Sequence, residues 1–345
     1  MKILPKDKAD ALNQQFGSVF SPVQDRVPDL GPPAYKSVSN ISITIAGVRK
    51  LLQNQKPNKA GGPDNIQARF LKETAEELAP ALATTFQASL DQGQIPKDWR
   101  HARVAPLYKA GKNNRSKPAN YRPVSLTCLC CKILEHIVCS KMMEHLDRYN
   151  ILTDYQHGFR RKRSCESQLI ITVDDLARNL DQGKQIDCIL LDFAKAFDKV
   201  SHKCLTEKLR YYGICGQMLK WIEDFLSCRT QVVVVEGQES YVAPVTSGVP
   251  QGSVLGPALF LVYINDLPES LKSTPRLFAD DCMLYRVIEG PEDAEELQRD
   301  LERLQRNIHS CHKDVKKTSY CTFVCPVLDY CCTVWDQHKR NNTKV

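Results

Sequence analysis

The chain has 345 residues, of which 42% are hydrophobic and 25% are charged, and its formal net charge is +7. This length suits one large domain or two smaller ones with a sizeable core. The absence of a signal peptide and of any apolar run of membrane length argues against a secreted or membrane-spanning protein. We therefore expect an intracellular protein, cytoplasmic or nuclear or both, that needs no membrane.

The 15 cysteines are scattered along the chain without a regular framework, which favours reduced thiols. Cys128 and Cys131 have a Cys-x-x-Cys spacing but fall within a helical apolar pattern, so core packing is favoured over zinc binding. The tail contains a richer set whose spacings match no zinc pattern; it comprises Cys311, His312, Cys321, Cys325, Cys331, Cys332 and His338.

The first 55 residues predict a polar lead-in that is partly disordered, with a short helix at residues 43–52. A loop rich in Pro and Gly follows at residues 56–64. Apolar residues then recur at helical spacing until Gly93 and Pro96 end the pattern; they are Leu71, Ala75, Leu78, Leu82, Phe86 and Leu90.

Basic side chains concentrate at two places. Residues 97–122 contain eight Lys or Arg and a single acid, and a compact second cluster consists of Arg160, Arg161, Lys162 and Arg163. Such patches suit a phosphate-rich partner, and these four residues are candidates for nucleic-acid binding. A solvated face or a short localisation signal is the alternative interpretation.

An acidic pair, Asp280-Asp281, lies between two short apolar runs and predicts a β-hairpin with the acids at its turn. The mostly apolar run at residues 186–191 ends in Asp192 and predicts a buried strand. Because hard divalent cations bind carboxylate oxygens, Asp192 is the expected partner of the pair in a metal site. An isolated Asp-Asp pair is usually only a turn, so this interpretation depends on the pattern as a whole.

Two further features lie between the acidic strands. Residues 231–236 and 241–246 predict a pair of β-strands, and residues 247–253 read Ser-Gly-Val-Pro-Gln-Gly-Ser. Gly248 and Gly252 in this loop allow a backbone to come close to a base pair and a sugar.

In this order, the strand ending in Asp192, the Ser-Gly-Val-Pro-Gln-Gly-Ser loop and the Asp280-Asp281 hairpin closely resemble the palm of reverse transcriptases from non-LTR (LINE-type, jockey-like and CR1-like) retrotransposons. Residues 56–64 are similar to the Lys-x-x-Lys-Ala-x-Gly-Pro-Asp segment of that family. Residues 155–160 are similar to its Gln-x-Gly-Phe-Arg element. The resemblance is nearly continuous from about residue 56 to residue 288.

The resemblance implies an α+β fold, namely a right-hand polymerase core with helical fingers and an antiparallel palm sheet backed by helices. After the lead-in at residues 1–55, the fingers would occupy residues 56–185 and the palm residues 186–290. Residues 291–345 would form a helical, thumb-like remnant.

The resemblance also implies RNA-directed DNA synthesis, in which two metal ions assist nucleotidyl transfer to a primer 3′-hydroxyl. Asp192 and Asp280 would bind both Mg²⁺ ions, with Mn²⁺ as the alternative metal, and Asp281 would contribute to the same cluster. The implied partners are an RNA template, a DNA primer and dNTPs.

Five residues match nucleotide-binding positions of the family. Lys109 and Arg122 are candidates to clamp the triphosphate, with contact to template phosphates as the alternative. Phe197 matches an aromatic residue that blocks a 2′-hydroxyl, with plain core packing as the alternative. Gln251 and Gly252 belong to the matching loop. The neighbouring Asp198 is expected to be structural.

The resemblance breaks after the acidic hairpin. The family continues with a Trp-containing segment and a Phe-Asn-x-x-Lys-Cys stretch, whereas here a helical pattern leads almost at once into residues 306–311 and then into a thumb-side segment. We interpret this as an internal deletion. The resemblance does not include the endonuclease domain that such elements usually carry upstream. Two functions stay open: a reverse transcriptase weakened by the deletion, and a non-catalytic nucleic-acid-binding remnant of a mobile element. Phe197 disfavours an RNA-dependent RNA polymerase.

Overall fold

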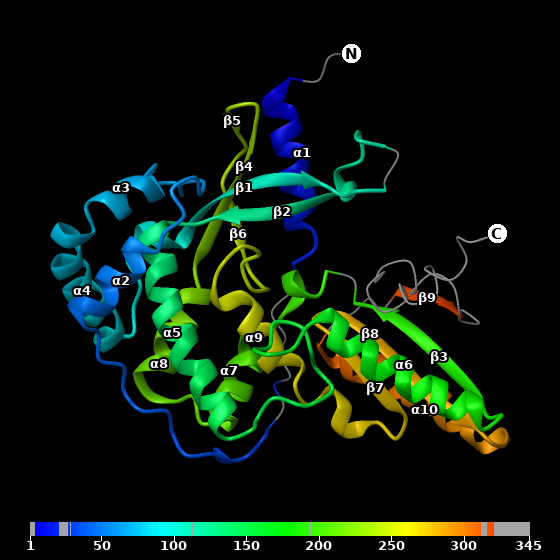
Figure 1. Cartoon of the computed structure of the whole chain (residues 1–345). Helices are drawn as coiled ribbons and strands as arrows, with labels where there is room; N and C mark the ends of the chain where they lie inside the picture. Colours follow the sequence, from blue (N-terminus) through cyan, green and yellow to red (C-terminus); the bar gives the residue numbers. More distant parts are fainter. Residues whose placement is uncertain are drawn as a thin grey trace, which may run out of the picture. The chain divides into compact units, whose positions relative to one another are not determined.

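The structure is a computed structural model that describes residues 4–20, 27, 29–111, 114–193, 195–311 and 316–320 (Figure 1). The chain divides into two compact units, each built from two separate stretches. Unit 1 comprises residues 1–151 and 195–263, and unit 2 comprises residues 152–194 and 264–345. Within the described residues, no helix has the length and apolar character needed to cross a bilayer.

Unit 1 combines helices with a mixed five-stranded sheet. The strand order is β2-β1-β4-β5, with β6 also paired to β4, and only the β1–β4 pair is parallel. Its strands are β1 (His101–Tyr108), β2 (Tyr121–Leu126), β4 (Arg229–Val235), β5 (Gln238–Glu239) and β6 (Ala243–Val245). Its helices are α1 (Pro5–Gly17), α2 (Ile45–Gln53), α3 (Ala68–Glu73), α4 (Ala75–Gln92), α5 (Leu129–Arg148), α7 (His202–Tyr211), α8 (Gly216–Leu226) and α9 (Leu255–Ile264), with short 3-10 turns η1 (Lys97–Arg100), η2 (Pro118–Asn120) and η3 (Phe197–Lys199).

Most of the expected elements of unit 1 are confirmed. The predicted helix at residues 43–52 is α2, and the long apolar pattern up to Gly93 forms α3 and α4. Gly93 ends α4 in the left-handed conformation, with a φ of 65°, as glycine does at many helix C-termini. The two strands expected around residues 231–246 are β4 and β6, which pair with each other.

The lead-in is more ordered than the sequence indicated, because residues 5–17 form the helix α1. Leu12 and Phe16, four residues apart, lie on one helix face and pack into a core cluster with Val104 of β1 and Val233 of β4. Few apolar residues occur in this segment, and this short buried stripe packs the helix against the sheet.

Unit 2 is built on a four-stranded sheet in the order β7-β8-β3-β9, in which every neighbouring pair is antiparallel. The strands are β3 (Gln185–Asp192), β7 (Thr274–Phe278), β8 (Asp281–Ile288) and β9 (Lys316–Tyr320), and the helices are α6 (Cys165–Asp181) and α10 (Pro291–Cys311), with a 3-10 turn η4 (Leu267–Ser270). The expected antiparallel palm sheet backed by helices, and with it the α+β class, is therefore confirmed.

The two helices of unit 2 cover opposite faces of its sheet. Tyr285 of β8 donates from its hydroxyl group to Asp175 of α6, whereas the next residue, Arg286, pairs with Asp293 of α10. Since successive side chains of a strand point to opposite faces, α6 and α10 lie on different sides.

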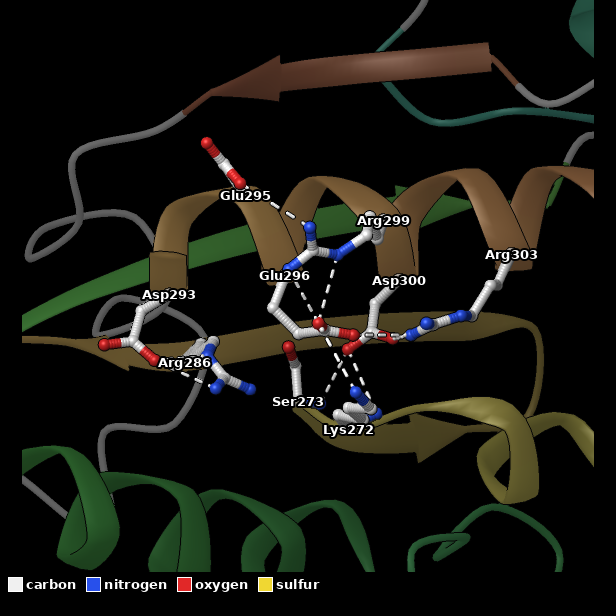
Figure 2. Close-up of polar contacts among 9 residues, drawn as sticks. All are labelled: Lys272, Ser273, Arg286, Asp293, Glu295, Glu296, Arg299, Asp300 and Arg303. Atoms are coloured by element: carbon white, nitrogen blue, oxygen red, sulfur yellow. Dashed lines mark hydrogen bonds and ion pairs between the residues drawn. The ribbon is translucent and has the colours of Figure 1, made fainter. Parts of the chain in front are cut away.

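Buried acids fix α10 to the rest of unit 2 (Figure 2). The Asp300 carboxylate is fully buried and accepts hydrogen bonds from the backbone N–H groups of Lys272 and Ser273, at 3.0 and 2.7 Å. Glu296 accepts from Arg303 at 2.8 Å and from Arg299, and these bonds hold the pKa of Glu296 at about 2. The helix that follows the acidic hairpin is thus attached by polar as well as apolar contacts.

The packing of α1 yields a stability prediction. Phe16→Ala should lower the free energy of unfolding by about 3–5 kcal/mol, because it leaves a cavity between the helix and the sheet. The matched control is Leu4→Ala just before α1, where the side chain is 65% exposed and the expected change is below about 0.5 kcal/mol. Urea unfolding measures both. Equal, small effects would show that α1 does not pack on the sheet in solution.

Candidate active site

Three aspartates of unit 2 lie together at one end of its sheet, where β3 ends and β8 begins. Asp192, the last residue of β3, is the direct partner of Asp281, the first residue of β8. Directly opposed residues of an antiparallel pair have Cα atoms about 4.5–5.5 Å apart and side chains on the same face. Asp192 and Asp281 are both exposed, and Asp280 precedes Asp281 in the hairpin turn. The expected strand and hairpin are therefore present, although only Ile189 and Leu191 of the strand are buried. The backbone brings the three acids to one place.

The hairpin turn consists of only two residues, Ala279 and Asp280, since Phe278 pairs with Asp281. Ala279 has a φ of 54°, in the left-handed region that favours glycine. A turn this short leaves the two acids little freedom to move apart along the chain.

The chemistry of this donor set suits a hard divalent cation, because all the ligands are carboxylate oxygens. Within the described part of the chain, however, no three His, Cys, Asp or Glu side chains are already gathered into a group that could hold a metal ion. The backbone register thus places the donors, and the side chains would have to turn toward a common point to bind an ion.

The expected nucleotide-binding loop, residues 247–253, belongs to unit 1 and is fixed by a buried carboxylate. Gln251 donates from Nε2 to Oδ1 of Asp198 at 2.7 Å, and its backbone carbonyl accepts from the N–H of Ser125 at 2.8 Å. Ser247 donates from its hydroxyl group to the Asp198 carbonyl at 2.8 Å. The structural role expected for Asp198 therefore has a definite form: it orients Gln251.

Asp198 is buried, and its second carboxylate oxygen, Oδ2, makes no hydrogen bond to the described residues. Burial raises the pKa of this carboxyl group, while the charges of Lys195 and Lys109 and the bond from Gln251 oppose the shift. A half-satisfied carboxylate in such a place is costly, so its contacts to the loop carry more free energy than an exposed pair would.

Two glycines let this loop approach its neighbours. A Cβ atom on Gly248 would lie 2.6 Å from the carbonyl oxygen of Asp198, and one on Gly252 would lie 2.7 Å from that of Ser125. Both residues also have positive φ, 86° and 104°. The two glycines thus let the loop lie close to the protein's own backbone, and the expected approach of a base pair and a sugar stays a prediction.

Phe197 lies directly beside this loop. Its carbonyl accepts from the N–H of Val249 at 2.8 Å, and its half-buried ring stacks on Phe260 of α9 with 4.4 Å between the ring centroids. The ring is thus held at a fixed position without being fully enclosed.

Lys109 and Arg122 lie on the hairpin formed by β1 and β2. Arg122 is opposite Leu107, and the N–H of Lys109 continues the ladder by donating to Asn120. By the alternation of side chains, Lys109 and Arg122 leave the same face of the hairpin as diagonal neighbours. The arrangement suits two cations that act on one anionic group.

The second basic cluster, in unit 2, is partly occupied by its own loop. Arg160 donates to the carbonyls of Leu152 and Thr153, and Arg163 donates to the carbonyl and the carboxylate of Asp154. Arg161 and Lys162 are exposed on the same segment. Of the four expected nucleic-acid contacts, these two have the more accessible charges.

One residue important for the loop had no assignment from the sequence. Glu135 of α5 is fully buried, and its Oε2 accepts from the N–H groups of Val254 and Leu255 at 2.7 and 3.1 Å. Burial raises the pKa of Glu135, and these backbone bonds oppose that shift. A carboxylate at the N-terminus of α9 satisfies donors that a helix leaves unpaired. An acid within the apolar face of a predicted helix was the available signal.

Ten cysteines lie in the well-described part of the chain, and none of them forms a disulfide there. Cys128 and Cys131 are buried and free, as predicted for core residues. Of the tail set, His312, Cys321, Cys325, Cys331, Cys332 and His338 lie outside the described residues.

The buried Asp198 gives a pH-dependent prediction. Because burial raises its pKa above the unfolded value of about 3.9, the group favours folding most at low pH, and this contribution is lost as the pH rises through the folded pKa. Asp198→Asn keeps an acceptor for Gln251 and removes the charge. The variant should therefore gain stability relative to the unsubstituted chain as the pH rises above about 4. Urea unfolding across that range tests this, and the opposite trend would contradict it.

The sequence of the chain is similar to those of known proteins. Residues 109–339 match the sequence profile described as "Reverse transcriptase (RNA-dependent DNA polymerase)". The chain is 30% identical over 239 residues to "RNA-directed DNA polymerase from mobile element jockey" of Drosophila melanogaster, and the match covers 69% of this chain and 26% of that protein.

Two other relatives from Drosophila melanogaster show the same partial coverage. The "Probable RNA-directed DNA polymerase from transposon X-element" is 31% identical over 69% of this chain and 27% of its own length. The "Probable RNA-directed DNA polymerase from transposon BS" is 28% identical over 76% and 30%. The chain thus spans less than a third of each of these relatives. The profile match, which covers most of the chain, shows that the protein belongs to the reverse transcriptase family.

Proposed function

We propose that this chain is the polymerase region of a non-LTR retrotransposon protein and that it synthesises DNA on an RNA template. The observation that carries the proposal is the register of β3 and β8, which sets Asp192 opposite Asp281 with Asp280 in the adjoining turn. Carboxylates brought together at one end of a sheet can hold the two divalent metals of nucleotidyl transfer. The names of the relatives support the choice of template and product.

Asp192, Asp280 and Asp281 would hold the divalent metals in this reaction. When bound, two such ions lower the pKa of the attacking hydroxyl group and neutralise charge on the leaving pyrophosphate. The contribution of the protein is to hold the three carboxylates at neighbouring backbone positions, at the end of β3 and in the β7–β8 hairpin, so that rotation of their side chains is enough to bring them to an ion.

The residues of unit 1 would bind the incoming nucleotide. Lys109 and Arg122, on one face of the β1–β2 hairpin, would offset the charge of the triphosphate. Gln251, oriented by Asp198, and the exposed Gly252 backbone would contact the base pair or the sugar. Phe197, stacked on Phe260, would exclude a 2′-hydroxyl group because its ring has little room to move.

Loss of one metal-binding carboxylate should nearly abolish synthesis. Asp192→Asn and Asp280→Asn should each reduce Mg²⁺-dependent primer extension by roughly 10²–10³-fold or more, because charge stabilisation in the transition state is lost. The matched control is Asp187→Asn. Asp187 lies on β3 opposite Arg286, away from the end of the sheet that carries the three aspartates, so this variant should leave extension unchanged.

Extension by the aspartate variants at the level of the unsubstituted chain would refute the proposal. If the unsubstituted chain binds an RNA–DNA duplex in a strongly salt-dependent manner but does not extend primers, the non-catalytic, nucleic-acid-binding function is correct instead.

The stacked ring of Phe197 gives a prediction about sugar choice. Phe197→Val should raise incorporation of ribonucleotides relative to deoxynucleotides by at least about tenfold, because it opens the space that the ring fills. Phe260→Leu should have a smaller effect in the same direction, since it removes the surface on which Phe197 stacks. Single-nucleotide incorporation with matched rNTP and dNTP pairs measures both. Unchanged discrimination in an active Phe197→Val enzyme would assign Phe197 to the core.

A further inference from the structure

Gln156 lies in the loop before α6, and its buried side chain contacts the acidic hairpin of unit 2. Only 2% of its surface is exposed. Its Oε1 atom accepts from the N–H of Ala279 at 2.9 Å and from the N–H of Gly158 at 2.7 Å. Its Nε2 atom donates to the carbonyl of Ala279 at 3.3 Å. One amide group thus binds both backbone polar groups of a single turn residue, much as a neighbouring strand would.

The residue that Gln156 holds is the one immediately before the acidic pair. Ala279 is buried and has a φ of 54°. For a residue with a Cβ atom, this left-handed conformation costs roughly 1–2 kcal/mol, and buried backbone groups also need hydrogen-bond partners. Gln156 offsets both costs, since its contacts satisfy the N–H and the carbonyl of Ala279 only when the turn has this shape.

The loop that carries Gln156 is itself fixed to the hairpin. The N–H of His157 donates to the carbonyl of Leu277 in β7, and the N–H of Leu277 donates to the carbonyl of Tyr155, both at 2.9 Å. A Cβ atom on Gly158 would lie 2.2 Å from the nitrogen of Ala279. Only glycine therefore allows the loop to lie this close to the turn. The loop that carries Gln156 is bonded to β7, the strand that leads into the turn.

We propose that Gln156 is a positioning residue for the acidic turn: its amide holds Ala279 in the conformation that presents Asp280 and Asp281 beside Asp192. This inference rests on the proposed two-metal function and assigns the Gln-x-Gly-Phe-Arg segment a role in it. A neutral amide fits the task because it donates and accepts at once. It also adds no charge next to three carboxylates, where a further anion would compete for the metal.

The experiment compares Gln156→Met with Gln168→Met. Methionine keeps the length of glutamine and removes its hydrogen bonds. Gln168 of α6 is the matched control, since it is a buried glutamine in the same unit whose side-chain N and O atoms bond none of the described residues. The full chain is studied with Mn²⁺ as the probe. Binding is followed by electron paramagnetic resonance, and hydrogen exchange is followed at the amides of residues 277–281.

In Gln156→Met, we expect exchange at the Ala279 amide to become at least tenfold faster and Mn²⁺ binding to weaken by roughly tenfold, the scale of one or two lost hydrogen bonds. Gln168→Met should leave both quantities unchanged. Gln156→Glu keeps the acceptor for the Ala279 N–H and loses the donor, so its exchange rate should lie between those of the unsubstituted chain and Gln156→Met. Exchange at the Ala279 amide in this milder variant serves as the test if Gln156→Met does not fold, because the added charge of Glu changes Mn²⁺ binding by itself.

The inference is overturned if a folded Gln156 variant shows unchanged Ala279 exchange and unchanged Mn²⁺ affinity, or if Gln168→Met causes the same losses. It is also overturned if Asp280→Asn does not weaken Mn²⁺ binding, because the turn then holds no metal. These readouts do not need catalysis. A chain that extends no primer but loses Mn²⁺ affinity in Gln156→Met refutes the polymerase proposal and leaves the role of Gln156 standing.

Discussion

The pairing of β3 with β8 is the constraint on which the candidate active site depends. A slip of one residue would move Asp192 away from Asp281 and turn its side chain to the other face of the sheet. The register is protected by apolar side chains rather than by the acids themselves. Ile189, Leu191 and Leu284 are buried, and the same slip would expose them. Hydrophobic burial in the strands therefore sets the geometry that the metal chemistry requires.

Away from the strands, hydrogen bonds from buried polar side chains to distant segments of the chain fix the conformation of the loops. Asp198 orients Gln251, Glu135 holds the N-terminus of α9, and Gln156 holds Ala279. In each case a side chain from one segment binds the backbone or an amide of a loop that has little apolar surface of its own. Such bonds are directional, and leaving one partner unsatisfied in the interior is expensive, so they fix loop conformation where hydrophobic contact cannot.

The sequence predicted the elements that carry a periodic signal. The strand ending in Asp192, the acidic hairpin and the antiparallel palm sheet are present in the structure, because apolar runs and turn residues determine them locally. The helix α1 was missed because its apolar stripe is short. The stripe becomes buried only when the helix packs on β1 and β4, which lie far away in the sequence. The contact of Gln156 was missed for a different reason. Its partner is a backbone group 123 residues away, and every residue carries the same backbone groups, so the sequence does not mark this one.

The interleaving of the two units has a consequence for synthesis of the chain on the ribosome. β3 leaves the ribosome about ninety residues before its partner β8, because residues 195–263 of unit 1 come between them. At typical translation rates, an apolar strand with both edges unpaired must wait roughly 5–20 s for its neighbour. During that interval β3 is a site for chaperone binding or for misassociation with another nascent chain. The length of this stretch of unit 1, residues 195–263, therefore contributes most of the time for which the sheet of unit 2 stays incomplete.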